Sequence, residues 1–241
     1  MGHVLLINPN TSAGVTARIA PVVSAQLGSG HRLSAVTARF GADYISSEAA
    51  YCIAAHAALD AFAVHGGDVQ GVLVGCFGDP GVLALRELLA GPVTGLAEAA
   101  MREAAGQGSF AIVTGGARWK PMLERLAVSL GLAGSLQHIE IVDRTGAQLA
   151  ADPAAAQRLL ADACTMAARS GARSIILGGA GLAGMAESLH RITALPLIDS
   201  VAAGGRAMHA ALEQPVGAAS GADGAAWTGV SAELARLVRP C

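Results

Sequence analysis

Short apolar runs recur along the chain, and each ends in a turn of small or polar residues that a stretch with helical spacing follows. The clearest runs are Val4–Ile7 and Gly71–Val74 in the first half, and Phe110–Thr114 and Ser174–Leu177 in the second. Continuous apolar runs of this length are typical of parallel strands buried on both faces. Their alternation with helices favours an α/β fold.

The two halves of the chain repeat this order at a nearly constant offset. Val4 aligns with Phe110 (110 − 4 = 106), and Cys76 aligns with Gly179 (179 − 76 = 103). We therefore expect two pseudo-symmetric four-stranded parallel-sheet units of flavodoxin or Rossmann-like type. The first unit would hold residues 1–104 and 204–241, and the second would hold residues 105–203. Because ligands bind at the carboxyl ends of parallel strands, we expect the active site in the cleft between the units.

The run that ends at Cys76 is the most informative one. Asp79 and Pro80 are typical of a helix N-cap and a first helical residue, so a helix is predicted from Pro80 to about Ala90. Cys76 would then lie at a strand end beside a helix N-terminus, where the partial positive charge favours a thiolate. Position alone leaves two interpretations open, a nucleophile or base and a small buried apolar residue.

Composition excludes several classes of function. The formal net charge is −2 and the 16 Lys and Arg residues are scattered, which argues against a nucleic-acid surface. No apolar run is long enough to span a bilayer, and the N-terminus has no basic leader, so we expect no membrane association and a cytoplasmic location. The four cysteines and seven histidines show no metal-ligand spacing, so no metal site is predicted.

One competing motif is present. Residues 179–184 fit G-x-G-x-x-G, and Asp199 follows Gly179 by 20 residues (199 − 179), as in a dinucleotide fingerprint. Only 42 residues follow Asp199 (241 − 199), which is too few for the remaining βα units of such a domain. A nicotinamide or flavin oxidoreductase is therefore the least favoured function, and the glycines are better explained as an anion-holding turn.

Several separate motifs together resemble the aspartate/glutamate/hydantoin racemase superfamily, and the hydantoin and allantoin racemases most of all. The resemblance covers residues 1 to about 212. The motifs are Ile7–Ser12, Gly75–Gly81, Arg86–Glu87, Pro92–Val93, Ile112–Thr114 and Leu177–Gly184.

This resemblance implies a cofactor-independent isomerase, a racemase of amino acids or their derivatives, that acts on a small-molecule substrate and forms a homo-oligomer. In such enzymes two cysteines face the stereocentre from opposite sides, and Cys76 matches the first of them. The resemblance also implies that the Asn10–Thr11 turn, Thr114 and the amides after Cys76 and after Gly178 hold the substrate's oxygens. The implied binding positions are Asn10, Thr11, Phe77, Gly78, Thr114, Ala180 and Gly181.

The chain departs from the family at the second cysteine, where Gly179 stands. Cys52 and Cys164 lie in predicted helices and are expected in the core, and Cys241 is the last residue. Three explanations stay open: a racemase that uses water or another side chain, by type His190 or His209, on the second face; a single-cysteine enzyme similar to arylmalonate decarboxylases; or a glycine introduced to silence the second base. A binding protein for small acids, without catalysis, is a further alternative.

Overall fold

The structure, a computed structural model, describes residues 2–144, 148–149, 152–190, 193–215, 222–223 and 226–239. It divides into two compact units. The first unit comprises Met1–Gly75, Asp79–Gly95 and Gly205–Cys241, and the second comprises Cys76–Gly78 and Leu96–Gly204.

The first unit contains a four-stranded parallel sheet in the order β2-β1-β3-β4. Its strands are β1 (Gly2–Asn8), β2 (His31–Thr37), β3 (Gly71–Val74) and β4 (Val93–Gly95). The central strands β1 and β3 are almost entirely buried, which explains their continuous apolar sequence, whereas the edge strand β2 is only half buried.

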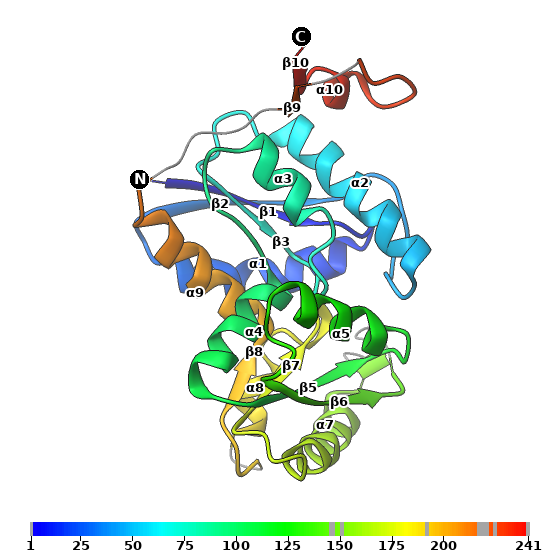
Figure 1. Ribbon diagram of the computed structural model, residues 1–241, viewed down its shortest axis with the longest axis vertical. Coiled ribbons are helices and arrows are strands. Elements are labelled where there is room, and N and C mark those ends of the chain that lie inside the picture. Colours follow the sequence, from blue (N-terminus) through cyan, green and yellow to red (C-terminus); the bar gives the residue numbers. More distant parts are fainter. Residues whose placement is uncertain are drawn as a thin grey trace. The chain divides into compact units, whose positions relative to one another are not determined.

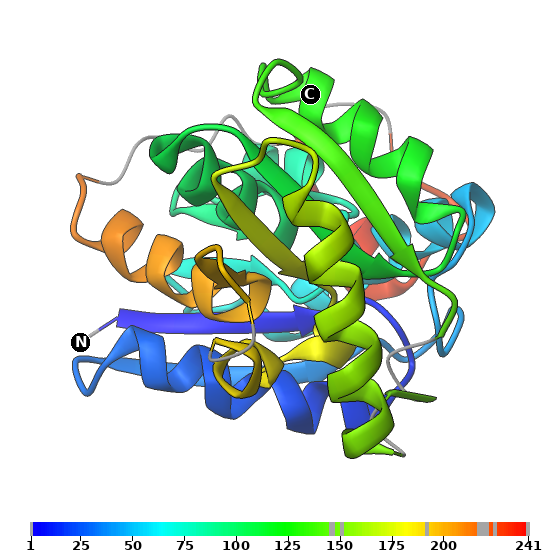
Figure 2. The ribbon, with the colours of Figure 1, turned by 90° about the horizontal axis from the view of Figure 1, so that it is seen from below.

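Helices cover both faces of this first sheet, as Figure 1 shows. Two helices, α2 and α3, pack on each other and lie on one face, and α1 lies alongside β1 and β2 on the other (Figures 1 and 2). The helices of this unit are α1 (Ala13–Leu27), α2 (Glu48–His65), α3 (Val82–Leu88), most of α9 (Ser200–Leu212) and α10 (Ala232–Ala235). A small two-stranded sheet joins β9 (Ala222–Asp223) to β10 (Val238–Arg239).

The second unit repeats the same topology, with a parallel sheet in the order β6-β5-β7-β8. Its strands are β5 (Phe110–Gly115), β6 (Leu136–Val142), β7 (Ser174–Gly178) and β8 (Leu197–Asp199). Its helices are α4 (Leu96–Gln107), α5 (Trp119–Ser129), α7 (Pro153–Ala168), the 3-10 helix η1 (Ala180–Leu182) and α8 (Met185–Leu189). The predicted fold of two matched four-stranded parallel sheets is confirmed.

The second sheet also carries helices on its faces. Helix α7 packs along β5, β6 and β7, and Figure 2 shows it in front of these strands. Its side chains join Ala111, Val113, Ile175 and Leu177 in one buried apolar cluster. Helix α4 contacts β5, β7 and β8 and belongs to this unit, whereas the internal repeat predicted that residues up to 104 belong to the first unit. The proposed domain boundaries stay a prediction.

A charged cluster attaches the C-terminal helix α10 to the first unit. The carboxylate of Asp60 on α2 accepts two hydrogen bonds of 2.7 Å from Arg39 and one of 2.6 Å from the Ser231 hydroxyl, which caps α10. Burial acts to raise the pKa of Asp60, but the hydrogen bonds from Arg39 and Ser231 outweigh it, so this pKa lies below its usual value. We call these three residues the Asp60 cluster.

Among the residues placed by the structure, we find no helix with the length and hydropathy that a membrane span requires. The predicted linker at 214–226 lies largely outside the described residues, as does Cys241.

Candidate active site

Cys76 stands just past the carboxyl end of the central strand β3. The Gly75 amide continues the sheet by donating to the Ile7 carbonyl at 2.7 Å, and the chain then turns, with the Gly78 amide donating to the Cys76 carbonyl at 3.0 Å. The Cys76 side chain is buried, with 7% of its surface exposed. The predicted position at a strand end is therefore what the structure has.

The predicted helix start after Cys76 is wrong. Helix α3 begins at Val82, not at Pro80, and its N-cap is Gly81 with φ 82°, without a capping side chain. Asp79 does not cap the helix but takes a left-handed conformation, φ 60°. It packs against Gly95, where a β-carbon would lie only 2.1 Å from the Asp79 carboxylate. The helix begins six residues after Cys76 (82 − 76), so the expected neighbouring N-cap is replaced by a longer turn.

Two aromatic rings hold the Cys76 turn within the second unit. The Phe77 ring lies on Gly178, where a β-carbon would come within 2.2 Å of it. The Trp119 ring lies on Gly78, where a β-carbon would come within 2.3 Å. Phe77 and Trp119 are both buried. Thus the residue that follows Cys76 contacts the residue that precedes Gly179.

Strand register supports the internal match between Cys76 and Gly179. The pairs at the same rung of the two sheets are Val4 with Gly71 and Phe110 with Ser174. If Val4 corresponds to Phe110, Gly71 corresponds to Ser174, and five residues further along each chain segment lie positions 76 (71 + 5) and 179 (174 + 5). The two turns therefore follow equivalent strands of the two sheets.

Gly179 has a backbone that side chains rarely adopt. Its φ is 139°, although the space beside it is open, because the nearest atom to a β-carbon there would be Leu182 Cγ at 3.8 Å. Its amide donates to the hydroxyl of Ser200 at 3.2 Å, and Ser200 is fully buried. Sequence reasoning missed Ser200, because a serine at a helix start carries no signal of this contact 21 residues away.

The turn after β1 is built by asparagine side chains. Asn8, fully buried, donates to Asn10 Oδ1 at 2.9 Å and to Thr16 Oγ1 at 3.0 Å, and Asn10 Oδ1 also accepts from the Ser12 amide at 2.9 Å. The Asn10 Nδ2 group makes no hydrogen bond with any described residue. The Asn10 amide is therefore oriented by its oxygen and has two N–H groups to offer to a ligand. Thr11 is half buried, and its backbone amide donates to the Ala42 carbonyl at 3.0 Å.

The remaining predicted binding positions lie at strand ends of the second sheet. Thr114 is buried on β5 and faces Gly178 across the β5–β7 register. Ala180 and Gly181 open the 3-10 helix η1, and the first amides of a helix have no partner within it. The structure thus brings Phe77, Gly178 and Thr114 to one edge of the second sheet.

The acid of the competing dinucleotide motif has another role. Asp199 accepts hydrogen bonds from the amides of Val201 and Ala202 at 2.8 and 3.1 Å, and from Gly184 at 2.6 Å. It therefore caps α9 and ties the glycine-rich turn to that helix. The turn leads only into a 3-10 helix and the five-residue α8, which is unlike the long helix of a dinucleotide fold.

Of the two other cysteines that the structure describes, one is buried as predicted and the other is not. Cys164 is in the core as predicted, and burial raises the pKa of its thiol to about 11. The prediction for Cys52 is wrong, because this side chain is exposed on α2. His190 and His209 are both exposed.

Comparison with known proteins identifies the family. The family model described as Asp/Glu/Hydantoin racemase matches residues 4–208. The chain belongs to this racemase family. A hydantoin racemase of Rhizobium meliloti is 32% identical over 207 residues, which cover 83% of this chain and 85% of that protein.

Solved structures agree with this assignment. The allantoin racemase of Klebsiella pneumoniae superposes with a TM-score of 0.82 at 32% identity, covering 87% of each chain. Unliganded arylmalonate decarboxylase has a TM-score of 0.59 at 17% identity, covering 90% of this chain and 94% of that one, and so shares the fold. Membership in the family supports a racemase-type isomerase.

Proposed function

We propose that the protein moves a proton at the α-carbon of a hydantoin, of allantoin or of a related amino-acid derivative, without a cofactor, with the Cys76 thiol as acid and base. The names of the hydantoin racemase and the allantoin racemase described above support this substrate class. The observation that carries the proposal is the position of Cys76 at a strand end, in a turn that Phe77 packs against Gly178 beside the matching turn.

The chemistry follows from the groups at the turns. In thiolate form, Cys76 takes the proton from the α-carbon, and the C–H electrons move into the neighbouring carbonyl to give an enolate. The negative oxygen needs hydrogen-bond donors that are oriented in advance. The first amides of η1, which have no partner within that helix, are donors of this kind, and the buried Thr114 adds a hydroxyl in the same unit as Cys76. The thiol then returns its proton to carbon, and the carbonyl re-forms.

The glycine at position 179 determines whether this proton transfer retains or inverts the configuration at the α-carbon. With a thiol on one face alone, return of the proton by Cys76 regenerates the same enantiomer, and inversion needs a proton from water or another group on the other face. The glycine also favours a second candidate, a decarboxylase with a single cysteine. In that reaction a malonate loses carbon dioxide, the C–C electrons form an enediolate, and Cys76 protonates its carbon.

The test is proton exchange in deuterated water. Single enantiomers of 5-substituted hydantoins and allantoin are incubated with the protein, deuterium at carbon is followed by NMR, and optical purity by chiral chromatography. Exchange with inversion supports a racemase, and exchange with retention supports one-face proton transfer. Loss of carbon dioxide from an arylmalonate without exchange on hydantoins supports the decarboxylase. Absence of all three contradicts catalysis and leaves a binding protein.

The variant Cys76→Ser tests the thiol. Because a serine hydroxyl is a far weaker acid than a thiol, we expect turnover to fall by at least about 10²-fold, the lower range for loss of a general acid or base. The exposed Cys52→Ser is the matched control and should keep wild-type activity. An active Cys76→Ser enzyme would refute the proposed role of the thiol.

A further inference from the structure

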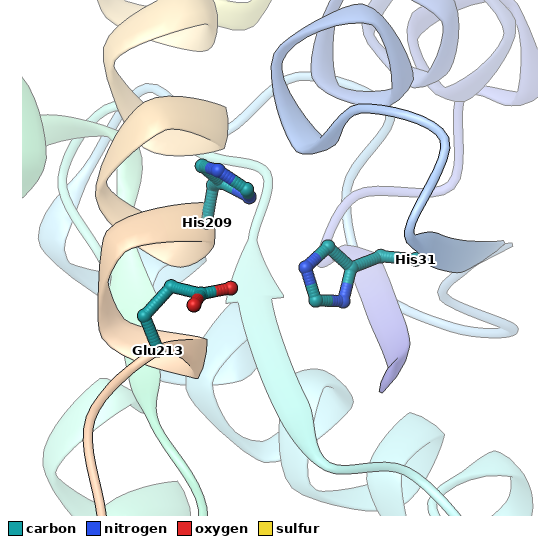
Figure 3. A group of neighbouring side chains, drawn as sticks. All are labelled: His31, His209 and Glu213. Atoms are coloured by element: carbon teal, nitrogen blue, oxygen red, sulfur yellow. The ribbon is translucent and has the colours of Figure 1, made fainter. Parts of the chain in front are cut away.

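Three metal-ligating side chains meet in the first unit, away from the candidate active site. They are His31, the first residue of β2, His209 on α9 and Glu213 just after α9. One ligand atom from each lies within 4.8 Å of the others. Figure 3 shows the three side chains pointing toward one another from the two elements.

Contacts of helix α9 and of strand β2 hold these three side chains near one another. His209 and Glu213 are four residues apart, so they lie on one face of the helical segment. Helix α9 is anchored by Met208 and Leu212, which contact Gly71 at the start of β3. The His31 ring lies against Gly2 on β1, where a β-carbon would be 2.7 Å from its Nδ1 atom. The anchoring of α9 and the absence of a side chain at Gly2 thus bring the histidines together.

The two imidazole rings are in edge-to-face contact, which keeps them side by side. Their centroids lie 5.5 Å apart with an interplanar angle of 75°. The Nδ1 atom of His31 is buried without a hydrogen-bond partner among the described residues. Its position against Gly2 leaves Nε2 as the ring nitrogen for a ligand. A neutral histidine that binds an ion through Nε2 carries its proton on Nδ1. The unpartnered Nδ1 therefore does not itself indicate an ion, and the proposal rests on the three converging ligand atoms.

We propose that His31, His209 and Glu213 bind a divalent transition-metal ion of the zinc class. Two imidazoles and one carboxylate are a known zinc ligand set that leaves a fourth position for water. With zinc–ligand bonds of 2.0–2.2 Å, tetrahedral ligand atoms lie about 3.4 Å apart. The present separations extend to 4.8 Å, so on binding the exposed His209 and Glu213 would have to move toward His31.

The ion would join the last turn of α9 to the first residue of β2. Both lie at the amino ends of the parallel strands, whereas Cys76 follows a carboxyl end. The proposed site is therefore separate from the thiol chemistry, and the two proposals stand or fall independently. Because the ion would bind only the folded chain, its binding should also raise thermal stability.

The experiment uses the full chain without a histidine tag, stripped with a chelator, in a Cys52→Ser background that removes the exposed thiol. Zinc is titrated by calorimetry, and Co²⁺ is added separately as a spectroscopic probe. We expect one ion per chain, a rise in melting temperature, and cobalt bands of nitrogen and oxygen ligation without a thiolate charge-transfer band. The variants His209→Ala and Glu213→Gln should each raise the Kd at least about tenfold, which is the lower range even for loss of an outer-shell partner.

His65→Ala is the matched control, because His65 is an exposed histidine of the same unit outside this cluster, and it should leave the Kd unchanged. All three substituted side chains are exposed, and circular dichroism checks that each variant is folded. Failure of zinc to bind the wild-type chain would overturn the proposal. An unchanged Kd in His209→Ala and Glu213→Gln, or a thiolate band with cobalt, would overturn it as well.

Discussion

The contact between Phe77 and Gly178 yields a quantitative prediction for Gly178→Ala. The added β-carbon would lie 2.2, 2.5 and 2.6 Å from three atoms of the Phe77 ring. Nonbonded carbons rarely approach closer than about 3.5 Å, so the ring must retreat by roughly 1.3 Å (3.5 − 2.2). Phe77 is 4% exposed and has little space into which to move.

Overpacking of this kind costs about 1–3 kcal/mol. For a chain of this size, that loss lowers the melting temperature by about 2–12 °C. The retreat of Phe77 also displaces the adjacent Cys76, and a misplacement of about 1 Å at a reacting group lowers the rate by roughly 10²-fold. We therefore expect Gly178→Ala to lose both stability and kcat/KM.

The assays are thermal unfolding and the exchange kinetics described above. Gly134→Ala is the control, because Gly134 is exposed and a β-carbon there meets no atom within 4 Å. In a Phe77→Leu background, the smaller side chain should leave room for the added methyl group. Gly178→Ala should therefore lower the free energy of unfolding less in that background than in the wild type. A Gly178→Ala protein with wild-type stability and activity would refute the inference that the Phe77 ring positions the Cys76 turn.

Two further predictions concern Gly179 and the Asp60 cluster. Gly179→Cys places a thiol in open space at a φ that costs about 1–3 kcal/mol; we expect lower stability but faster inversion of hydantoins, and an unchanged inversion rate would mean that the two turns do not act on one substrate. Asp60→Asn should destabilise the protein at pH 7, measured by urea unfolding. Because the folded-state pKa of Asp60 is lowered, its stabilising contribution is complete above the unfolded value of about 3.9 and is lost as the pH falls through the folded value. The difference between wild type and Asp60→Asn should therefore shrink in acid, and a constant difference would contradict this role.

The strands were predictable because burial on both faces leaves a continuous apolar run. Val4–Ile7 and Gly71–Val74 carry that signal, and both are central strands in the structure. The repeat was predictable because the apolar runs and turns of the two halves follow one another at a nearly constant offset. Both are local or periodic properties that a sequence displays directly.

The errors arose where tertiary contacts override local preference. Asp79 precedes a proline, as an N-cap does, yet the space at Gly95 admits its side chain and lets the backbone turn left-handed. Cys52 was assigned to the core because it lies inside a helix. The alanine-rich helix α2 has apolar residues on every side, so the sequence does not show which face is buried. Helix periodicity gives little guidance in such a segment.

The candidate site was predictable only as a set of strand ends. The packing of Phe77 on Gly178 and of Trp119 on Gly78 depends on residues about 100 and 40 positions apart in the chain, and a sequence gives no sign of such pairs. The same reason hid the cluster of His31 and His209, which are 178 residues apart (209 − 31).

Because the two sheets share one strand order, each strand end in one half of the chain has a counterpart in the other half. Asn8 stands where the second sheet has Thr114 (114 − 8 = 106), and Cys76 stands where it has Gly179, whereas the interiors of the central strands β1, β3, β5 and β7 are largely apolar in both sheets. The central strands of the two halves thus keep their apolar character without keeping the same residues, whereas the strand ends differ in chemistry. The end residues could be exchanged between the halves, one pair at a time, and the stability and turnover of each variant measured. Such variants would show which differences between the halves the fold accepts and which the reaction requires.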